Sequence, residues 1–79
     1  MTYSEAVAMR IKTLCKQAKI TPNKLGKLAG LDPSTITSIF YGKSKNPGLV
    51  TLGKVCHGLD MTLANFFDDE LFMDLENIK

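Results

Sequence analysis

The sequence predicts an all-α protein in which five short helices surround one core, followed by a possible short C-terminal helix. Apolar residues recur at steps of three and four along most of the chain, which is the spacing of one helix face. The same residue types also mark successive segments, because Thr or Asp precedes an apolar run and Gly or Asp follows it. No stretch alternates apolar and polar residues as a strand would, so the 79 residues are interpreted as one small helical domain.

The first helix is expected to begin after Thr2 and to end near Lys19. In "TYSE", the Thr2 hydroxyl can accept a hydrogen bond from the third helical N–H while Glu5 reaches back to the cap, an arrangement called a capping box. The apolar stripe of this helix has steps of four, three and four, and it consists of Val7, Ile11, Leu14 and Ala18.

The second helix is expected within "ITPNKLGKLAG". Thr21 is a good N-cap, Pro22 suits the first helical position, and Gly30 can end the helix in a left-handed conformation. The residues expected to face inward are Leu25, Leu28 and Ala29. Gly26 costs this helix about 1 kcal/mol relative to alanine. We therefore expect another segment of backbone to cross very close to Gly26.

The third helix repeats this pattern in "LDPSTITSIFYG". Asp32 is expected to cap it, Pro33 to occupy its first turn and Gly42 to end it. Only Gly30 and Leu31 separate it from the helix before. Two short helices joined in this way, with a glycine where they cross, predict a helix-turn-helix.

A fourth helix is expected in "LVTLGKVCHGL", after the polar loop "KSKNPG", with Asp60 closing it in a left-handed conformation. Its inward residues are expected to be Leu49, Leu52, Val55, Cys56 and Leu59. Thr62 is expected to cap a fifth helix, which holds Leu63, Phe66 and Phe67. These elements together predict one domain over residues 1–68.

Residues 69–79 are interpreted as an acidic, amphipathic extension of that domain, either a further helix or a fraying end. Its apolar residues are Leu71, Phe72, Leu75 and Ile78. The first three could fold onto their own domain or pair with a second subunit. Exposed aromatic side chains at this density favour pairing, so a dimer through Leu71, Phe72 and Leu75 is predicted.

The net charge of +2 conceals an uneven distribution. Residues 1–59 carry nine Lys and Arg against two acidic residues, a net charge of +7. Residues 60–79 carry one Lys against six acidic residues, a net charge of −5. Such a body attracts polyanions and such a tail is expected to face away from them, although ordinary solvated helix faces would explain any single lysine.

The remaining composition points to a cytoplasmic protein without a metal or cofactor. No apolar run approaches the roughly 20 residues that span a bilayer, and the N-terminus lacks the layout of a signal peptide. Cys15 and Cys56 lie 41 positions apart among apolar residues, so buried free thiols are expected. With His57 as the single histidine, no zinc pattern is present.

The third helix carries an unusual number of hydroxyls for residue types that form helices poorly. On a helical wheel, Ile36, Ile39 and Phe40 share one side. The opposite side and its flank carry Ser34, Thr37, Ser38 and Tyr41. Short hydroxyl side chains keep this face slim and can donate to or accept from base edges in the major groove of DNA, which is about 12 Å wide.

The chain resembles the phage-repressor-like Cro/C1 (Xre) helix-turn-helix family over residues 6–68 or so. The resemblance is carried by the spacing of Leu25-Gly26, Ala29-Gly30, Ile36 and Ile39, by "YGKSKNP", and by "LVTLGKVCHGLDMTLANFF". It implies the λ-repressor-like fold of five short helices and sequence-specific binding to duplex DNA. The third helix would lie in the major groove, usually in a two-fold dimer.

The resemblance also implies roles for individual residues. The positions that match base contacts are Pro33, Ser34, Thr37 and Ser38. The positions that match phosphate contacts are Asn23, Lys24, Lys43, Lys45 and Asn46, and Tyr41 either stacks on the sugar-phosphate backbone or covers the helix end. The chain departs from the family in having no Gln, Asn or Arg between Pro33 and Tyr41, so specificity is expected to depend on methyl contacts, water and DNA shape.

The leading hypothesis is a transcription regulator, a repressor that binds a palindromic operator as a homodimer. The alternative is a protein-interaction module, antitoxin-like or antirepressor-like, whose acidic and aromatic tail docks on another protein while DNA binding is weak or secondary. The missing long polar readers and the tail's charge favour the alternative. An enzyme is not expected, because the chain has one histidine, no glycine-rich phosphate loop and no converging carboxylates; Asp68, Asp69 and Glu70 are interpreted as a solvated end.

Overall fold

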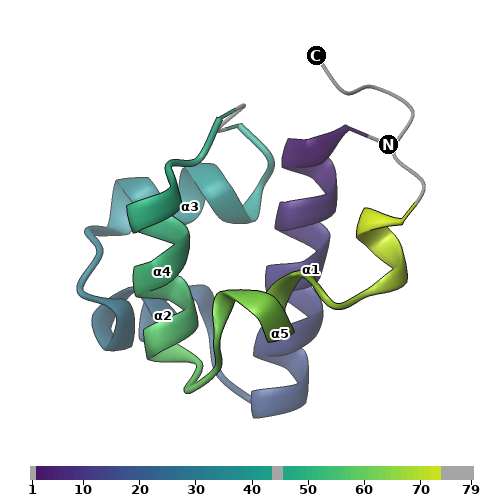
Figure 1. The fold of residues 1–79 in the computed structure, drawn as a ribbon. Helices are drawn as coiled ribbons and strands as arrows, with labels where there is room; N and C mark the ends of the chain where they lie inside the picture. The colour runs from purple at the N-terminus through teal and green to yellow at the C-terminus, as the bar shows by residue number, and fades with distance from the viewer. Residues whose placement is uncertain (1, 44–45, 74–79) are drawn as a thin grey trace.

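Five α-helices and one 3₁₀ turn make up the fold in a computed structural model, which describes residues 2–43 and 46–73 (Figure 1). The predicted all-α fold is confirmed, and the fifth helix is followed by the 3₁₀ turn η1 where a short C-terminal helix was expected. The elements are α1 (Tyr3–Ala18), α2 (Pro22–Ala29), α3 (Pro33–Phe40), α4 (Leu49–Gly58), α5 (Leu63–Phe67) and η1 (Glu70–Phe72).

Four helices begin at the predicted capping residues. The side chains of Thr2, Thr21, Asp32 and Thr62 each accept a hydrogen bond from the backbone N–H three residues later, at 2.8–3.2 Å. The Thr2 N–H in turn donates to Glu5 Oε1 at 2.8 Å, which completes the capping box of α1. These caps use residues that are close in sequence, so each helix start is fixed locally.

Four helices also end in the same way. The backbone is left-handed at Lys19, Gly30, Gly42 and Asp60, with φ between 56° and 72°. In each case the next N–H along the chain donates to a carbonyl five residues back, at 2.8–3.0 Å. These bonds form Schellman motifs, which satisfy carbonyl groups at the end of each helix. The predicted ends at Gly30, Gly42 and Asp60 are therefore confirmed.

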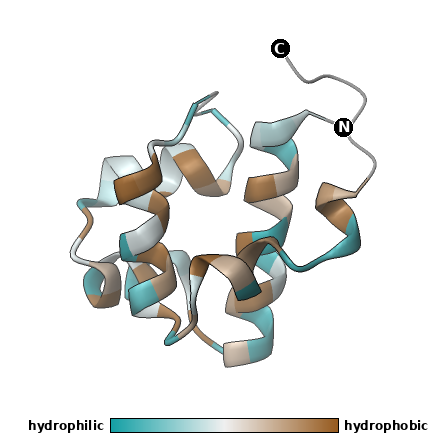
Figure 2. Ribbon diagram, viewed as in Figure 1, coloured by the Kyte–Doolittle hydropathy of each residue, from teal (hydrophilic) through white to brown (hydrophobic). Residues whose placement is uncertain are grey.

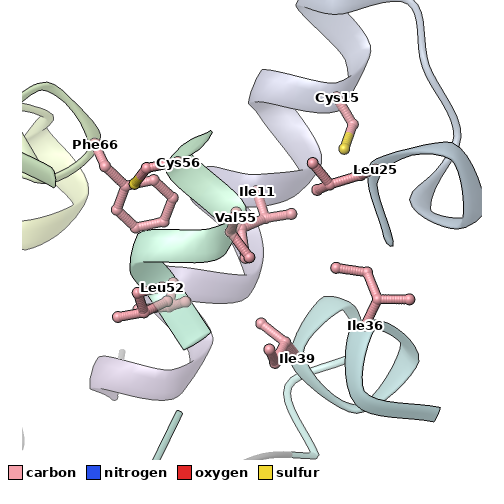
Figure 3. Close-up of a cluster of buried hydrophobic side chains, with 10 residues drawn as sticks. Ile11, Cys15, Leu25, Ile36, Ile39, Leu52, Val55, Cys56 and Phe66 are labelled. Carbon is pink, nitrogen blue, oxygen red and sulfur yellow. The ribbon is translucent and has the colours of Figure 1, made fainter. Parts of the chain in front are cut away.

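The core draws one large, fully buried side chain from each α-helix (Figure 3). These five side chains are Ile11, Leu25, Ile36, Val55 and Phe66, each at most 1% exposed. Removing a side chain of this size from water stabilises the fold by about 1.5–3 kcal/mol. Because Ile36 belongs to α3, the core holds the third helix in place from its apolar side.

Two glycines allow the closest contacts of the helix-turn-helix. A Cβ atom at Gly26 would lie 3.2 Å from Ile36 Cγ2 and 3.4 Å from the Leu31 carbonyl oxygen. The expected close crossing at Gly26 therefore exists, although a side-chain methyl group supplies its nearest atom. The closest backbone crossing is at Gly58, where a Cβ would lie 3.0 Å from the Ala29 backbone nitrogen. Gly58 thus lets α4 pack directly against the end of α2.

The predicted inward faces were wrong at several positions. Leu28 is 45% exposed and Leu49 is 69% exposed. The buried face of α2 consists of Leu25, Gly26 and Ala29, because α3 crosses α2 on the Gly26 side. Leu28 lies outside this face. Leu49 opens α4, one turn before the buried part of that helix begins; in Figure 2 this first turn of α4 is brown. Ala18 of the predicted apolar stripe and Phe67 of the predicted fifth helix are also exposed.

Arg10 fastens α1 to the C-terminal part of the fold. Its Nε donates to the Phe66 carbonyl at 2.8 Å, its Nη2 to the Asn65 carbonyl at 2.9 Å, and its Nη1 to Asp69 Oδ2 at 3.1 Å. Asp69 Oδ1 also accepts from the Leu71 N–H and caps η1. The interpretation of Asp68, Asp69 and Glu70 as a solvated end was therefore wrong for Asp69. Arg10, one of the nine basic residues of the predicted basic body, is therefore paired with Asp69.

The two cysteines are buried free thiols, as predicted. Burial raises the pKa of both Cys15 and Cys56. Among the described residues, no helix has the length and apolar character needed to cross a bilayer. Residues 2–43 and 46–73 also contain no cluster of three or more His, Cys, Asp or Glu side chains that could hold a metal ion.

Candidate nucleic-acid interface

Helix α3 presents its hydroxyl side chains to solvent. Ile36 and Ile39 are 1% and 3% exposed and hold the helix against the core. Ser34 and Thr37 are exposed on the other side, and Ser38 is half-buried beside them. The arrangement expected from the helical wheel is therefore present. In Figure 2 the first turn of α3 is pale, in contrast to the brown first turn of α4.

The N-terminal turn of α3 combines a proline ring and a serine hydroxyl with a carboxylate. Pro33 and Ser34 are exposed, and so is the cap Asp32. Asp32 Oδ1 accepts from the Thr35 N–H at 2.8 Å and from the Ser34 hydroxyl at 3.1 Å. Hydrogen bonds from Thr35, and then from Ser34, hold the pKa of Asp32 below its ordinary value of 3.8. The carboxylate is therefore ionised at neutral pH.

The C-terminal end of α3 carries an exposed aromatic side chain. Tyr41 is 63% exposed, and its ring meets the Phe40 ring edge to face at 5.3 Å between centroids. Lys12 Nζ lies 5.6 Å from the Phe40 centroid and 5.8 Å from the Tyr41 centroid, within the range of a cation–π contact. The sequence did not assign Lys12 to the interface; the available signal was the basic stripe that Lys12, Lys16 and Lys19 form along α1.

The start of the loop after α3 is hydrogen-bonded to the helix. The Lys43 N–H donates to the Ser38 carbonyl at 2.8 Å, so this lysine is fixed next to the hydroxyl face. The Lys43 and Asn46 side chains are both exposed. Lys45, the third predicted phosphate contact of this loop, lies outside the described residues.

The start of α2 offers one backbone donor besides its side chains. Pro22 has no N–H, and the Lys24 N–H donates to the Thr21 hydroxyl at 3.1 Å. Within the described residues, the Asn23 N–H is then the first-turn donor without a partner. The side chains of Asn23 and Lys24 are exposed. A phosphate at this helix end would therefore meet one N–H, one amide and one ammonium group.

Of the predicted dimer residues, Leu71 and Phe72 belong to η1. The Phe72 ring packs within its own chain, 4.9 Å from the Phe67 ring and 6.1 Å from the Phe66 ring between centroids. Phe72 therefore folds onto its own domain, which is one of the two alternatives expected for this segment. Leu71 is half-buried, and Leu75 lies outside the described residues. Phe67 and Phe72 line an open groove of about 1040 Å³, whose other apolar walls include Tyr3 and Leu52. Tyr41 and Asn46 line the same groove, so it borders the loop after α3.

Residues 10–70 match the Cro/C1-type HTH DNA-binding domain. The chain belongs to this family. Its fold is also similar to the crystal structure of the prophage Lp1 protein 11, with a TM-score of 0.82 and 35% sequence identity. That similarity covers 95% of this chain and 99% of the prophage protein. Among curated proteins, no sequence matches this chain. The resemblance stated from the sequence is thus confirmed, and duplex DNA is the ligand of the family's domain.

Proposed function

We propose that this protein is a sequence-specific transcription regulator that places α3 in the major groove of its operator. The observation that carries the proposal is the exposed hydroxyl face of α3, held outward by buried Ile36 and Ile39 in a Cro/C1-type domain. A helix fixed from behind presents its outer side chains at one depth and angle. Such rigidity is what discrimination between base edges requires.

Base readout would come from short side chains. The hydroxyls of Thr37 and Ser38 can meet donors or acceptors of base edges, and the Ser34 oxygen can meet a donor. The Thr37 methyl group and the Pro33 ring can contact a thymine methyl. The helix has no glutamine, asparagine or arginine that could make a bidentate base contact. DNA shape and bridging water are therefore expected to contribute much of the specificity.

Phosphate contacts would flank the reading helix on both sides. Lys43 and Asn46 lie in the loop after α3, and Asn23 and Lys24 lie at the start of α2. Tyr41, exposed between α3 and the loop, can stack on a sugar or donate its hydroxyl to a phosphate. Lys45 is proposed as a further contact from its position in the sequence. These contacts would position the protein on DNA without reading its sequence.

We further propose that the protein acts as a repressor and binds a palindromic operator as a dimer. Two copies related by a two-fold axis would place their α3 helices about 34–36 Å apart, one turn of the duplex. The exposed apolar side chains of Tyr3 and Phe67, which line the same groove as Phe72, support a contact between copies. Leu71 and Leu75 are proposed to contribute to the same contact.

Selection of binding sites from a pool of random duplexes tests this proposal at a stated salt concentration. We expect a two-fold-related motif. Ser34→Ala should change the preferred base at one position of each half-site, and Lys43→Gln should weaken binding to all sequences alike. The Lys43 variant should also reduce the slope of log affinity against log salt by about 0.9. Lys54→Gln removes an exposed lysine of α4 outside the proposed interface and is the matched control.

The absence of any enriched motif, together with salt-insensitive binding, would rule out the regulator. Sedimentation of the free protein and of the complex tests the dimer separately. Deletion of residues 74–79 keeps Phe72, which packs within its own chain, and removes Leu75. If the deleted protein still forms the same dimer, Leu75 has no part in the contact. If the full chain stays monomeric on a palindromic site, the proposed dimer is wrong.

A further inference from the structure

Asp32 lies beside the first base-reading hydroxyl of α3, and it does more there than cap the helix. Its Oδ1 atom accepts the Ser34 hydroxyl at 3.1 Å as well as the Thr35 N–H at 2.8 Å. Asp32, Pro33 and Ser34 are all exposed, on the turn that leads into α3. The carboxylate is therefore part of the surface that the proposed function turns toward DNA.

The hydrogen bond to Asp32 decides what Ser34 can do at a base edge. A serine hydroxyl has one hydrogen to donate and two lone pairs that accept. Because the hydrogen is directed at Asp32 Oδ1, the Ser34 oxygen has only its lone pairs left for DNA. An ionised carboxylate is also an acceptor without a donor, and Oδ2 is not used by the hydrogen bonds of the described residues. The pair thus presents acceptors only.

The bases differ sharply in how they meet an acceptor-only surface. In the major groove, guanine presents two acceptors, N7 and O6, and thymine presents the acceptor O4 beside its methyl group. Cytosine presents its N4 amino group, a donor, with no neighbouring acceptor of its own. Adenine presents its N6 amino group next to the acceptor N7. A surface of acceptors therefore fits the free N4 hydrogen of cytosine best and adenine next, whereas guanine would bring acceptor against acceptor.

We propose that Asp32 is a specificity-determining residue, which together with Ser34 selects cytosine, and adenine second, at one position of each half-site. This inference rests on the proposed function and names the base class that one part of the interface reads. It assigns Asp32 a role that its position as a helix cap did not indicate. The signal in the sequence was an acidic cap placed two residues before a serine of the reading face.

The same site selection, performed on the full chain, tests this inference with variants that keep the fold. Asp32→Asn retains a good N-cap but replaces a lone-pair oxygen by an amide donor. Ser34→Ala removes one of the two acceptors. Asp60→Asn removes the same charge at a left-handed helix end, a conformation that asparagine tolerates, and leaves α3 untouched. It is the matched control for the general gain in DNA affinity that the loss of any acidic residue brings.

We expect wild-type protein to enrich cytosine over guanine at one position. Asp32→Asn should lower that ratio by about tenfold, within the range of one good base contact. Ser34→Ala should lower the ratio at the same position, and Asp60→Asn should leave it unchanged. Thermal denaturation of each variant shows that the protein remains folded.

Three outcomes would overturn the inference. If Asp32→Asn enriches the same motif as wild type, Asp32 only caps the helix, and the proposed function stands. If the position that responds to Asp32→Asn carries guanine or thymine in the wild-type motif, the acceptor argument is wrong, and again the regulator stands. If wild type enriches no motif at all, the proposed function fails and this inference fails with it.

Discussion

Replacement of Gly58 by alanine provides the sharpest test of how α4 packs against the helix-turn-helix. A Cβ atom built at Gly58 would lie 3.0 Å from the backbone nitrogen of Ala29, and 3.2 Å from both its Cα and its Cβ. All three are atoms of the chain near its backbone, so no flexible side chain can move aside. The two helices must separate or tilt to admit the methyl group. Gly53, one and a half turns earlier in α4, has nothing within 4 Å of the same built atom.

Gly53→Ala and Gly58→Ala should therefore change the free energy of unfolding in opposite directions. Alanine gains up to about 1 kcal/mol over glycine inside a helix, so Gly53→Ala should stabilise the protein by about that amount. At Gly58 the gain is smaller because this residue ends the helix, and overpacking costs about 1–3 kcal/mol. We expect a net loss of about 1–2 kcal/mol for Gly58→Ala. For a domain of this size, that lowers the melting temperature by about 5–15 °C.

Thermal and urea denaturation followed by circular dichroism measure both effects in the same buffer. The urea slope should stay constant, because neither change alters the surface exposed on unfolding. Equal stability of Gly58→Ala and wild type would refute the close packing of α2 and α4. A loss of stability in Gly53→Ala comparable to that in Gly58→Ala would show that alanine disturbs α4 for another reason.

Three further predictions concern the rest of the fold. Arg10→Met should lower the free energy of unfolding by about 2–4 kcal/mol, because it leaves three acceptors without their donor; urea denaturation measures the loss. The pKa of Asp32 is lowered chiefly by Thr35, so the stability from this cap is present above pH 3.8 and lost as the pH falls through the lowered value. Melting curves between about pH 5 and pH 2 should therefore fall less steeply for Asp32→Asn than for wild type. Cys15 and Cys56 should resist a thiol reagent at pH 8 and react once urea unfolds the chain, because both are at most 3% exposed and burial raises the pKa of each thiol. Rapid labelling of the native protein would contradict the packed core.

The candidate interface could be predicted from the sequence at the level of α3 as a whole. The alternation of hydroxyl and isoleucine residues over one helix fixes which side faces the core, and Ile36 and Ile39 are buried as expected. The link between Asp32 and Ser34 does not follow from the capping pattern, because that pattern involves only the bond from the cap residue to the backbone. The contact of Lys12 with Tyr41 could not be found from a pattern, because it joins α1 to the end of α3 across the fold.

The sequence by itself determined where four of the five helices begin and where four of them end. Thr2, Thr21, Asp32, Thr62 and the left-handed residues at the helix ends act through hydrogen bonds within five residues, so their effect does not depend on the rest of the chain. Only the tertiary structure decided which sides of the helices are buried by neighbouring helices. Leu49 was left exposed, Gly58 became the closest helix contact, and Arg10 became the bridge to Asp69. These outcomes depend on which helices meet and at what angle, and no periodicity along one helix carries that information.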